Sequence, residues 1–135
     1  LNIGGYKYDK YTNTYPIFIN YDKSEEVSAS IRYEDRFVDQ SRLIAISKSQ
    51  RTIASDDVDN AIHAEERHIL MPLFVRKNKD DKTSKEFYFL GTMKHNGHLQ
   101  EFIMPDTDKS AVEIGYHLNT PVENNLYEYI TERTI

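Results

Sequence analysis

The sequence predicts a mostly β or α+β fold, an antiparallel barrel or sandwich with about two helices. Seven short runs of β-branched and aromatic residues follow one another with a turn signal roughly every ten residues, a spacing typical of barrels and sandwiches rather than of βαβ units. The chain contains ten Tyr and six Phe but no Trp, and such residues suit a sheet. With 135 residues it can bury one sizeable core, so we expect a single domain over residues 1–135.

The strands are predicted from the first apolar run onward. Residues 15–21, YPIFINY, contain Pro16 near the start, where a strand can do without a ladder hydrogen bond. The polar segment 78–85 separates two apolar runs, as the loop of a hairpin would. Further strands are expected at 31–38, 42–48, 69–76, 86–94, 98–104 and 111–118.

Two helices are predicted to interrupt the strands. Ser55 is a favourable N-cap, and the acidic pair Asp56 and Asp57 lies where the helix dipole favours anions, so we expect a helix over about 55–67. The run Thr120-Pro121-Val122-Glu123 has the pattern of a capping box with Pro at the first helical position. This second helix is expected to close the domain near the C-terminus.

Composition excludes several classes of protein. The net charge of −5 argues against a domain that coats nucleic acid without specificity, although it leaves room for a local basic face. The apolar runs are far shorter than the ~20 residues of a membrane helix, so no membrane partner is expected. The absence of Cys excludes disulfides and thiolate sites. The lack of Cys, of a leader and of a membrane span leads us to expect an intracellular protein. The chain begins at Leu1, without an initiator Met, so we expect a fragment of a larger protein.

One segment predicts a binding pocket. If residues 31–38 form a strand, its period of two places Tyr33, Asp35 and Phe37 on one face. A carboxylate among rings is costly to bury unless it is paired. Rings that stack on an extruded cytosine, and a carboxylate that accepts its exocyclic N–H, would use this arrangement. The alternative is that Asp35 pairs with an arginine such as Arg42 or caps backbone amides.

A second segment predicts contacts with sugar–phosphate oxygens. Residues 47–52, SKSQRT, combine two cations with hydroxyls and an amide directly before the first predicted helix. Lys48, Ser49 and Arg51 are the candidate contacts, with Arg42 in reserve. The alternative is an ordinary solvated turn.

The sequence offers little for catalysis or metal binding. His95 and His98 form the only close histidine pair, without the further ligands that a zinc site needs. A metal-dependent nuclease could use Asp106 and Glu113, but Gly115 occupies the position expected for its lysine. Phosphate-binding loops and nucleophile elbows are absent from the sequence. We therefore expect no metal site and no independent enzyme, with a cryptic nuclease as the weakest alternative.

Four blocks occur in order along the chain: YPIFINYDKSEEVSASIRYEDRF, ISKSQRTIASDDV, LFVRKNKDDKTSKEFYFLGTM and HLNTPVENNLYEYIT. Together they resemble the C-terminal domain-of-unknown-function family found behind bacterial superfamily-2 helicase domains, often with a phospholipase-D-type nuclease at the N-terminus. The resemblance implies the recognition module of a type IV restriction enzyme, acting in the bacterial cytoplasm. Such modules read 5-methylcytosine or 5-hydroxymethylcytosine and often have curved SRA-like or PUA-like β-barrels.

The resemblance also implies partners and cofactors. Double-stranded DNA with a modified cytosine and the helicase domain of the same chain are the expected partners, and a homodimer through the parent protein is a further option. ATP and Mg²⁺ would belong to the helicase and nuclease parts, so this domain needs no cofactor.

The expected roles follow from combining the alternation with the resemblance. Tyr33 and Phe37 would form the pocket wall, and Asp35 would accept the cytosine N4–H, with Tyr21 and Ser30 as weaker pocket candidates. The competing hypothesis is a protein-interaction or dimerisation module that docks onto the helicase through an exposed aromatic strand, residues 87–89.

Overall fold

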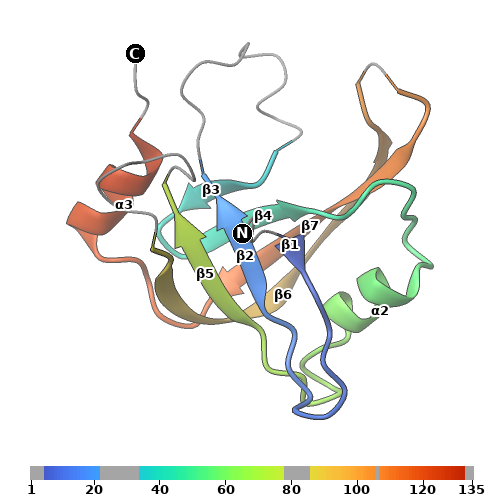
Figure 1. Cartoon of the computed structure of the whole chain (residues 1–135), viewed down its shortest axis with the longest axis horizontal. Helices are drawn as coiled ribbons and strands as arrows, with labels where there is room; N and C mark the ends of the chain where they lie inside the picture. Colours follow the sequence, from blue (N-terminus) through green and yellow to red (C-terminus); the bar gives the residue numbers. More distant parts are fainter. Residues whose placement is uncertain (1–4, 22–33, 78–85, 106, 133–135) are drawn as a thin grey trace.

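The computed structural model describes residues 5–21, 34–77, 86–105 and 107–132, which form one seven-stranded mixed sheet and two helices (Figure 1). The prediction of a mostly β or α+β fold is confirmed. The strands lie in the order β1-β2-β5-β6-β7-β4-β3, and all neighbours are antiparallel except β2 and β5. In chain order the elements are β1 (Gly5–Tyr6), β2 (Ile17–Asn20), β3 (Arg36–Asp39), β4 (Arg42–Ile46), α2 (Asp56–Ile62), β5 (Pro72–Arg76), β6 (Tyr88–Ile103), β7 (Ser110–Leu118) and α3 (Asn124–Thr131).

The long strand β6 joins the two halves of the sheet. Its first residues pair with β5 and the remainder pairs with β7. The register shifts between His95 and Leu99, where Gly97 has φ +97° and the Asn96 side chain accepts a hydrogen bond from the His98 N–H. The predicted strands 86–94 and 98–104 are therefore one strand, because this bulge bends the chain without ending the ladder.

The sheet is strongly curved but it is not a closed barrel, and this corrects the predicted architecture. Two tyrosine hydroxyls from the β1–β2 half reach backbone amides at the other end of the sheet. Tyr21 Oη accepts from the Phe37 N–H at 2.8 Å, and Tyr6 Oη accepts from the Lys48 N–H at 3.0 Å. In a closed barrel the two edge strands, β1 and β3, would pair with each other. Here tyrosine side chains accept from backbone amides across the opening instead.

Strand β3 is shorter than predicted. Residues 31–33 of the expected strand lie outside the described residues, and β3 begins only at Arg36. Asp35 therefore precedes the strand.

The helices lie close to their predicted positions but are shorter. Helix α2 ends at Ile62, and turns follow up to His68. His68 has a φ of +57°, and after it the Ile69 N–H donates to the Ala64 carbonyl. Helix α3 begins four residues after Thr120, and the Val122 N–H ahead of it donates to the Gln40 carbonyl. Its N-cap is Glu123, whose carboxylate accepts from two amides of the first turn.

The core lies on the concave face of the sheet, between the two helices. Alternate residues of β2, β4 and β5 and most residues of β7 are buried there, and Val58 and Ala61 of α2 and Ile130 of α3 complete it. The fully buried strand residues include Ile19, Leu43, Leu73, Val75, Val112, Tyr116 and Leu118. Within the described part of the chain, no helix has the length and apolar character needed to cross a membrane.

Replacing Gly115 with alanine is expected to lower the free energy of unfolding by about 1–3 kcal/mol, the usual range for overpacking. A Cβ at this position would lie 2.6 Å from the His98 Cβ and would also meet the Asn96 side chain, so the bulge of β6 would have to move. Urea unfolding measures the change. Ser110→Ala on the same strand should change stability by less than about 0.5 kcal/mol, and an equal loss in both variants would contradict the explanation.

Candidate functional site

A small cavity lies where the β1–β2 half of the sheet faces the end of β4. Its volume is about 30 Å³, which is room for a water molecule or two but not for a pyrimidine ring. One side is lined by the first two strands and the other by β4 and β7, with Asp35 between them. The lining residues are Gly5, Tyr6, Tyr15, Ile17, Phe18, Asp35, Ala45, Ile46, Ser47, Ile114 and Tyr116.

Asp35 joins the beginning of β3 to the end of β4. Its Oδ1 accepts a hydrogen bond from the Ile46 N–H at 2.7 Å. Arg42, the arginine considered as its partner, instead pairs with Asp39 at 2.7 Å. Of the two alternatives weighed from the sequence, the structure shows the bond to a backbone amide.

Two stacked tyrosines line the opposite wall. The rings of Tyr6 and Tyr15 lie 5.4 Å apart and nearly parallel, at 12°. Burial and the hydrogen bond to Asp57 raise the pKa of Tyr6 above its usual value. Burial likewise raises the pKa of Tyr15.

The carboxylate of Asp57 connects this wall to the basic segment. Its Oδ2 accepts from the Tyr6 hydroxyl at 2.6 Å and from Arg51 Nε at 2.8 Å. Burial pushes the pKa of Asp57 upward, but the hydrogen bonds from Tyr6 and Arg51 outweigh it and hold that pKa below its usual value. The Tyr15 hydroxyl donates to the backbone carbonyl of Asp57 at 3.0 Å.

The basic segment lies at the edge of the cavity. Ser47 lines the cavity and Lys48 follows it, with Nζ 4.9 Å from the centre of the Tyr6 ring. Lys48 and Ser49 are exposed, whereas Arg51 is held by Asp57. Asp35 and the segment 47–51, which the sequence offered as two separate candidates, are therefore neighbours.

Other predicted site residues lie elsewhere. Phe37 is buried in the core, where its ring contacts Tyr21 and Tyr127, with ring centres 5.5 Å and 5.6 Å away, and neither Phe37 nor Tyr21 lines the cavity. Arg42 begins the strand that Ile46 ends, about 13 Å away along β4. Tyr33 and Ser30 lie outside the described residues.

Comparison with protein families places the chain in a family. Residues 1–130 match the model of the family described as Domain of unknown function (DUF3427). The chain belongs to the DUF3427 family. No curated protein matches it. The family description names no activity, so in this member of the DUF3427 family the chemistry must be argued from the side chains.

Three residues of the site were not singled out from the sequence, namely Tyr6, Tyr15 and Asp57. Tyr15 was placed only in a strand and Asp57 only in a helix, and both assignments are compatible with their second role. For Tyr6 a signal existed, since Gly4-Gly5 leads directly into an aromatic residue. The contact between Tyr6 and Asp57 spans 51 positions of the chain, and no local pattern encodes it.

Of the two residues considered for a nuclease, Glu113 is engaged by basic side chains. Glu113 bonds to Arg36 at 3.1 Å and to His98 at 2.6 Å, while His95 Nδ1 lies 2.8 Å from the Gly115 carbonyl oxygen. Asp106 lies outside the described residues. Among the residues that the structure describes, no group of three or more His, Asp or Glu side chains could hold a metal ion.

Proposed function

We propose that this domain is a DNA-recognition module that reads 5-methylcytosine, and 5-hydroxymethylcytosine with it, by taking the flipped base into the cavity beside Asp35. The observation that carries the proposal is the meeting of three chemistries at one place: an acceptor at Asp35, the stacked rings of Tyr6 and Tyr15, and the exposed cation of Lys48. A flipped-base reader needs all three.

The cavity must enlarge to admit a base, and Tyr6 is the group that moves. It belongs to the two-residue strand β1, which among the described residues pairs with β2, so few backbone hydrogen bonds oppose its displacement. The movement would break the hydrogen bonds of its hydroxyl with Asp57 and with the Lys48 N–H. Its ring occupies the face of Tyr15 on which a base would stack. In the proposed complex the cytosine replaces the Tyr6 ring against Tyr15, and Asp35 accepts its N4–H.

The apolar part of the same cavity accepts the methyl group. Ile17, Ala45 and Ile114 line it, and no charged group lies among these three. One buried methyl contributes about 0.8 kcal/mol, roughly a fourfold preference in affinity. Lys48, Ser49 and Arg51 contact the sugar–phosphate backbone beside the flipped nucleotide.

Within a larger protein, the module would act with a motor and a nuclease. The sequence resembles the C-terminal part of SauUSI, an ATP-dependent type IV restriction enzyme, and ATP and Mg²⁺ would serve the upstream parts. The net charge of −5 fits a module whose nonspecific affinity for DNA is supplied by the helicase portion. No catalytic step is proposed for this domain.

Fluorescence polarisation with two duplexes tests the proposal. The duplexes differ only in one 5-methylcytosine, and we expect the chain to bind the methylated duplex about fourfold more tightly. Raising the salt concentration should weaken both complexes in parallel, since it screens backbone contacts and leaves the pocket unchanged. Equal affinity for the two duplexes at both salt concentrations would remove the assignment.

A further inference from the structure

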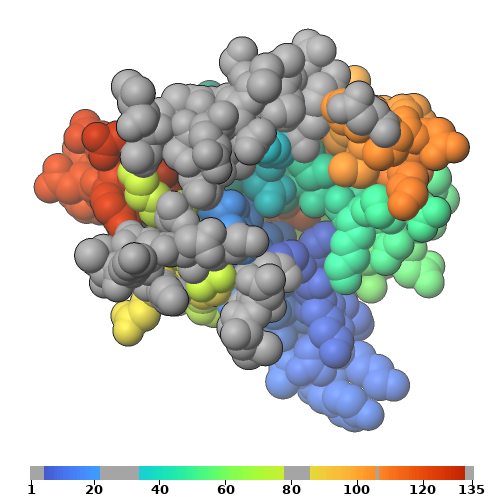
Figure 2. Space-filling view, turned by 45° about the horizontal axis from the view of Figure 1, so that its top comes forward, coloured from blue at the N-terminus to red at the C-terminus, as the bar shows by residue number. Residues whose placement is uncertain are grey.

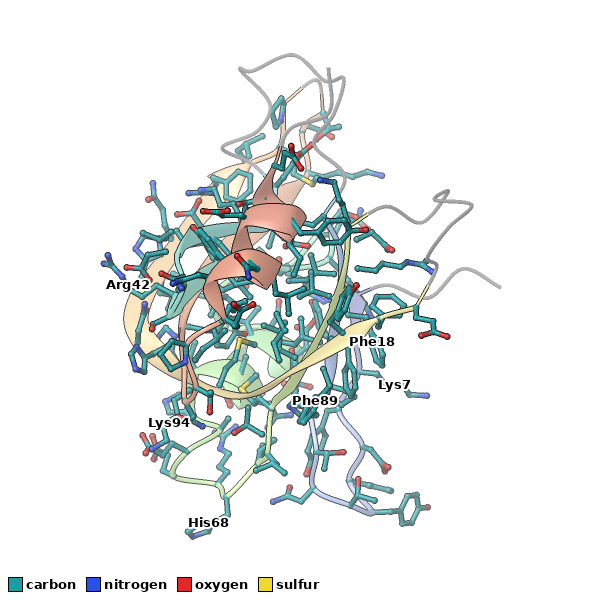
Figure 3. The ribbon with its side chains drawn as sticks, turned by 90° about the vertical axis from the view of Figure 1, so that its left-hand side faces the viewer. Lys7, Phe18, Arg42, His68, Phe89 and Lys94 are labelled. Carbon is teal, nitrogen blue, oxygen red and sulfur yellow. The ribbon has the colours of Figure 1, made fainter. Side chains whose placement is uncertain are left out.

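A row of phenylalanine rings crosses three neighbouring strands on the face of the sheet opposite the core. Phe18 of β2 stacks on Phe74 of β5 with ring centres 4.8 Å apart, and Phe74 contacts Phe89 of β6 at 5.3 Å. The strand neighbours of Phe18 and Phe74 are buried in the core, so the period of two directs these two half-buried rings to the opposite face. Phe89 is 61% exposed, and Figure 3 shows Phe18 and Phe89 on one side of the sheet with Lys7 beside them.

The aromatic row is extended around Phe18. Phe87 meets Phe18 edge to face at 5.4 Å, and the Arg76 guanidinium lies 4.5 Å from the centre of the Phe87 ring. Pro16, two residues before Phe18, borders an open hollow of about 650 Å³. Figure 2 shows the segment that carries this hollow, in blue, projecting from the body of the molecule.

The hollow brings cations and a further ring to the same face. Lys7 and Lys10 line it and are exposed, and Lys10 Nζ lies 5.4 Å from the centre of the Tyr11 ring. Tyr11 is 89% exposed. The nearby Asp9 carboxylate is engaged within its own turn, where it accepts from the Tyr11 amide and the Thr12 hydroxyl.

The chemistry of this face favours single-stranded nucleic acid over a protein partner. Exposed rings beside lysines are the combination with which proteins hold single strands, the bases stacking and the cations following the backbone. Lysine is depleted at protein–protein interfaces, whereas two lysines border this face.

We propose that the outer aromatic face, formed by Phe18, Phe74 and Phe89 and extended by Lys7, Lys10 and Tyr11, binds single-stranded nucleic acid by stacking. This site goes beyond the proposed base pocket: of its residues only Phe18 also borders the cavity, whereas Phe74, Phe89, Lys7, Lys10 and Tyr11 do not line it. Tyr6 and Lys7 are consecutive, and the first faces the cavity while the second lines the outer hollow.

Fluorescence anisotropy with a labelled oligothymidylate of about 12 nucleotides, within the ~4–16 that one binding fold covers, tests the inference with the 135-residue chain. We expect saturable binding that weakens with salt. Phe89→Ala should weaken it at least about fivefold through the lost stacking, and Lys7→Gln combined with Lys10→Gln should weaken it and reduce its salt dependence. Ile103→Ala is the matched control, because Ile103 is 60% exposed on the same strand.

The outcomes separate the two proposals. An unchanged affinity for the oligothymidylate in Phe89→Ala, an equal loss in Ile103→Ala, or no binding by the unsubstituted chain would overturn the outer site. A dimer in light scattering that Phe89→Ala dissociates, without oligonucleotide binding, would assign the face to protein contacts instead. The preference for a methylated duplex should survive Phe89→Ala, since that side chain does not line the cavity.

Discussion

Replacing Asp57 with alanine is expected to lower the free energy of unfolding by about 3 kcal/mol at pH 7, because one carboxylate partners both a hydroxyl and a guanidinium. The Tyr6 hydroxyl and Arg51 Nε both donate to its Oδ2. The substitution leaves both donors without this acceptor and loosens β1 from α2 and from the segment 47–51. Urea unfolding of the two proteins gives the difference directly.

The loss should depend on pH with a defined sign. The folded-state pKa of Asp57 lies below its usual value, so the carboxylate contributes full stability above the unfolded pKa of about 3.9. That contribution disappears as the pH falls through the lower, folded pKa. The difference between the unsubstituted chain and Asp57→Ala should therefore be constant between pH 5 and pH 7 and should shrink below pH ~4.

The neighbouring carboxylate provides the control. Asp56 is exposed in the same first turn of α2 and carries the same charge, so Asp56→Ala should cost less than about 1 kcal/mol, the ordinary effect of the helix dipole. Equal losses in the two variants would show that helix charge, rather than the contacts of Asp57, sets the stability.

Local patterns predicted the elements well but not how they meet. Strands β2, β4, β5 and β7 lie within their predicted ranges or one residue beyond them. Their signal, a short run rich in β-branched residues, is local and can be read directly from the sequence. The single β6 was expected as two strands, since Asn96-Gly97 is also a turn signal. The β2–β5 parallel pairing, between residues more than fifty positions apart, left no local trace in the sequence.

The candidate site was likewise predicted only in part. Asp35 was selected from its odd place in an aromatic run, and it does line a cavity. Phe37, selected by the same alternation, lies instead in the core against Tyr127 of α3, a residue ninety positions later in the chain. Alternation predicts which side chains share a face, but whether that face borders a cavity or the core depends on what packs against it.

Replacing Asp35 with asparagine is expected to abolish the preference for the methylated duplex while the domain remains folded. A carboxylate only accepts hydrogen bonds and can accept several at once, so in the proposed complex Asp35 accepts the N4–H of the base together with the Ile46 N–H. Asparagine offers a single acceptor oxygen, and its amide nitrogen is a donor. If its oxygen keeps the Ile46 bond, its NH₂ group meets the donor of the base.

The expected loss is about 2 kcal/mol, or roughly thirtyfold in affinity for the flipped base, the size of a hydrogen bond to a charged group. Without the bond to Asp35 neither base is held in the cavity, so its apolar part no longer distinguishes the methyl group. Both duplexes should then bind equally through the backbone contacts alone, as fluorescence polarisation would show. Asp39→Asn, which removes the same charge from the same β3–β4 hairpin but breaks only the contacts with Ser41 and Arg42, should leave the preference intact. A methyl preference that survives in Asp35→Asn would contradict the proposed role of Asp35. The carboxylate would then join β3 to β4 without taking part in binding the base.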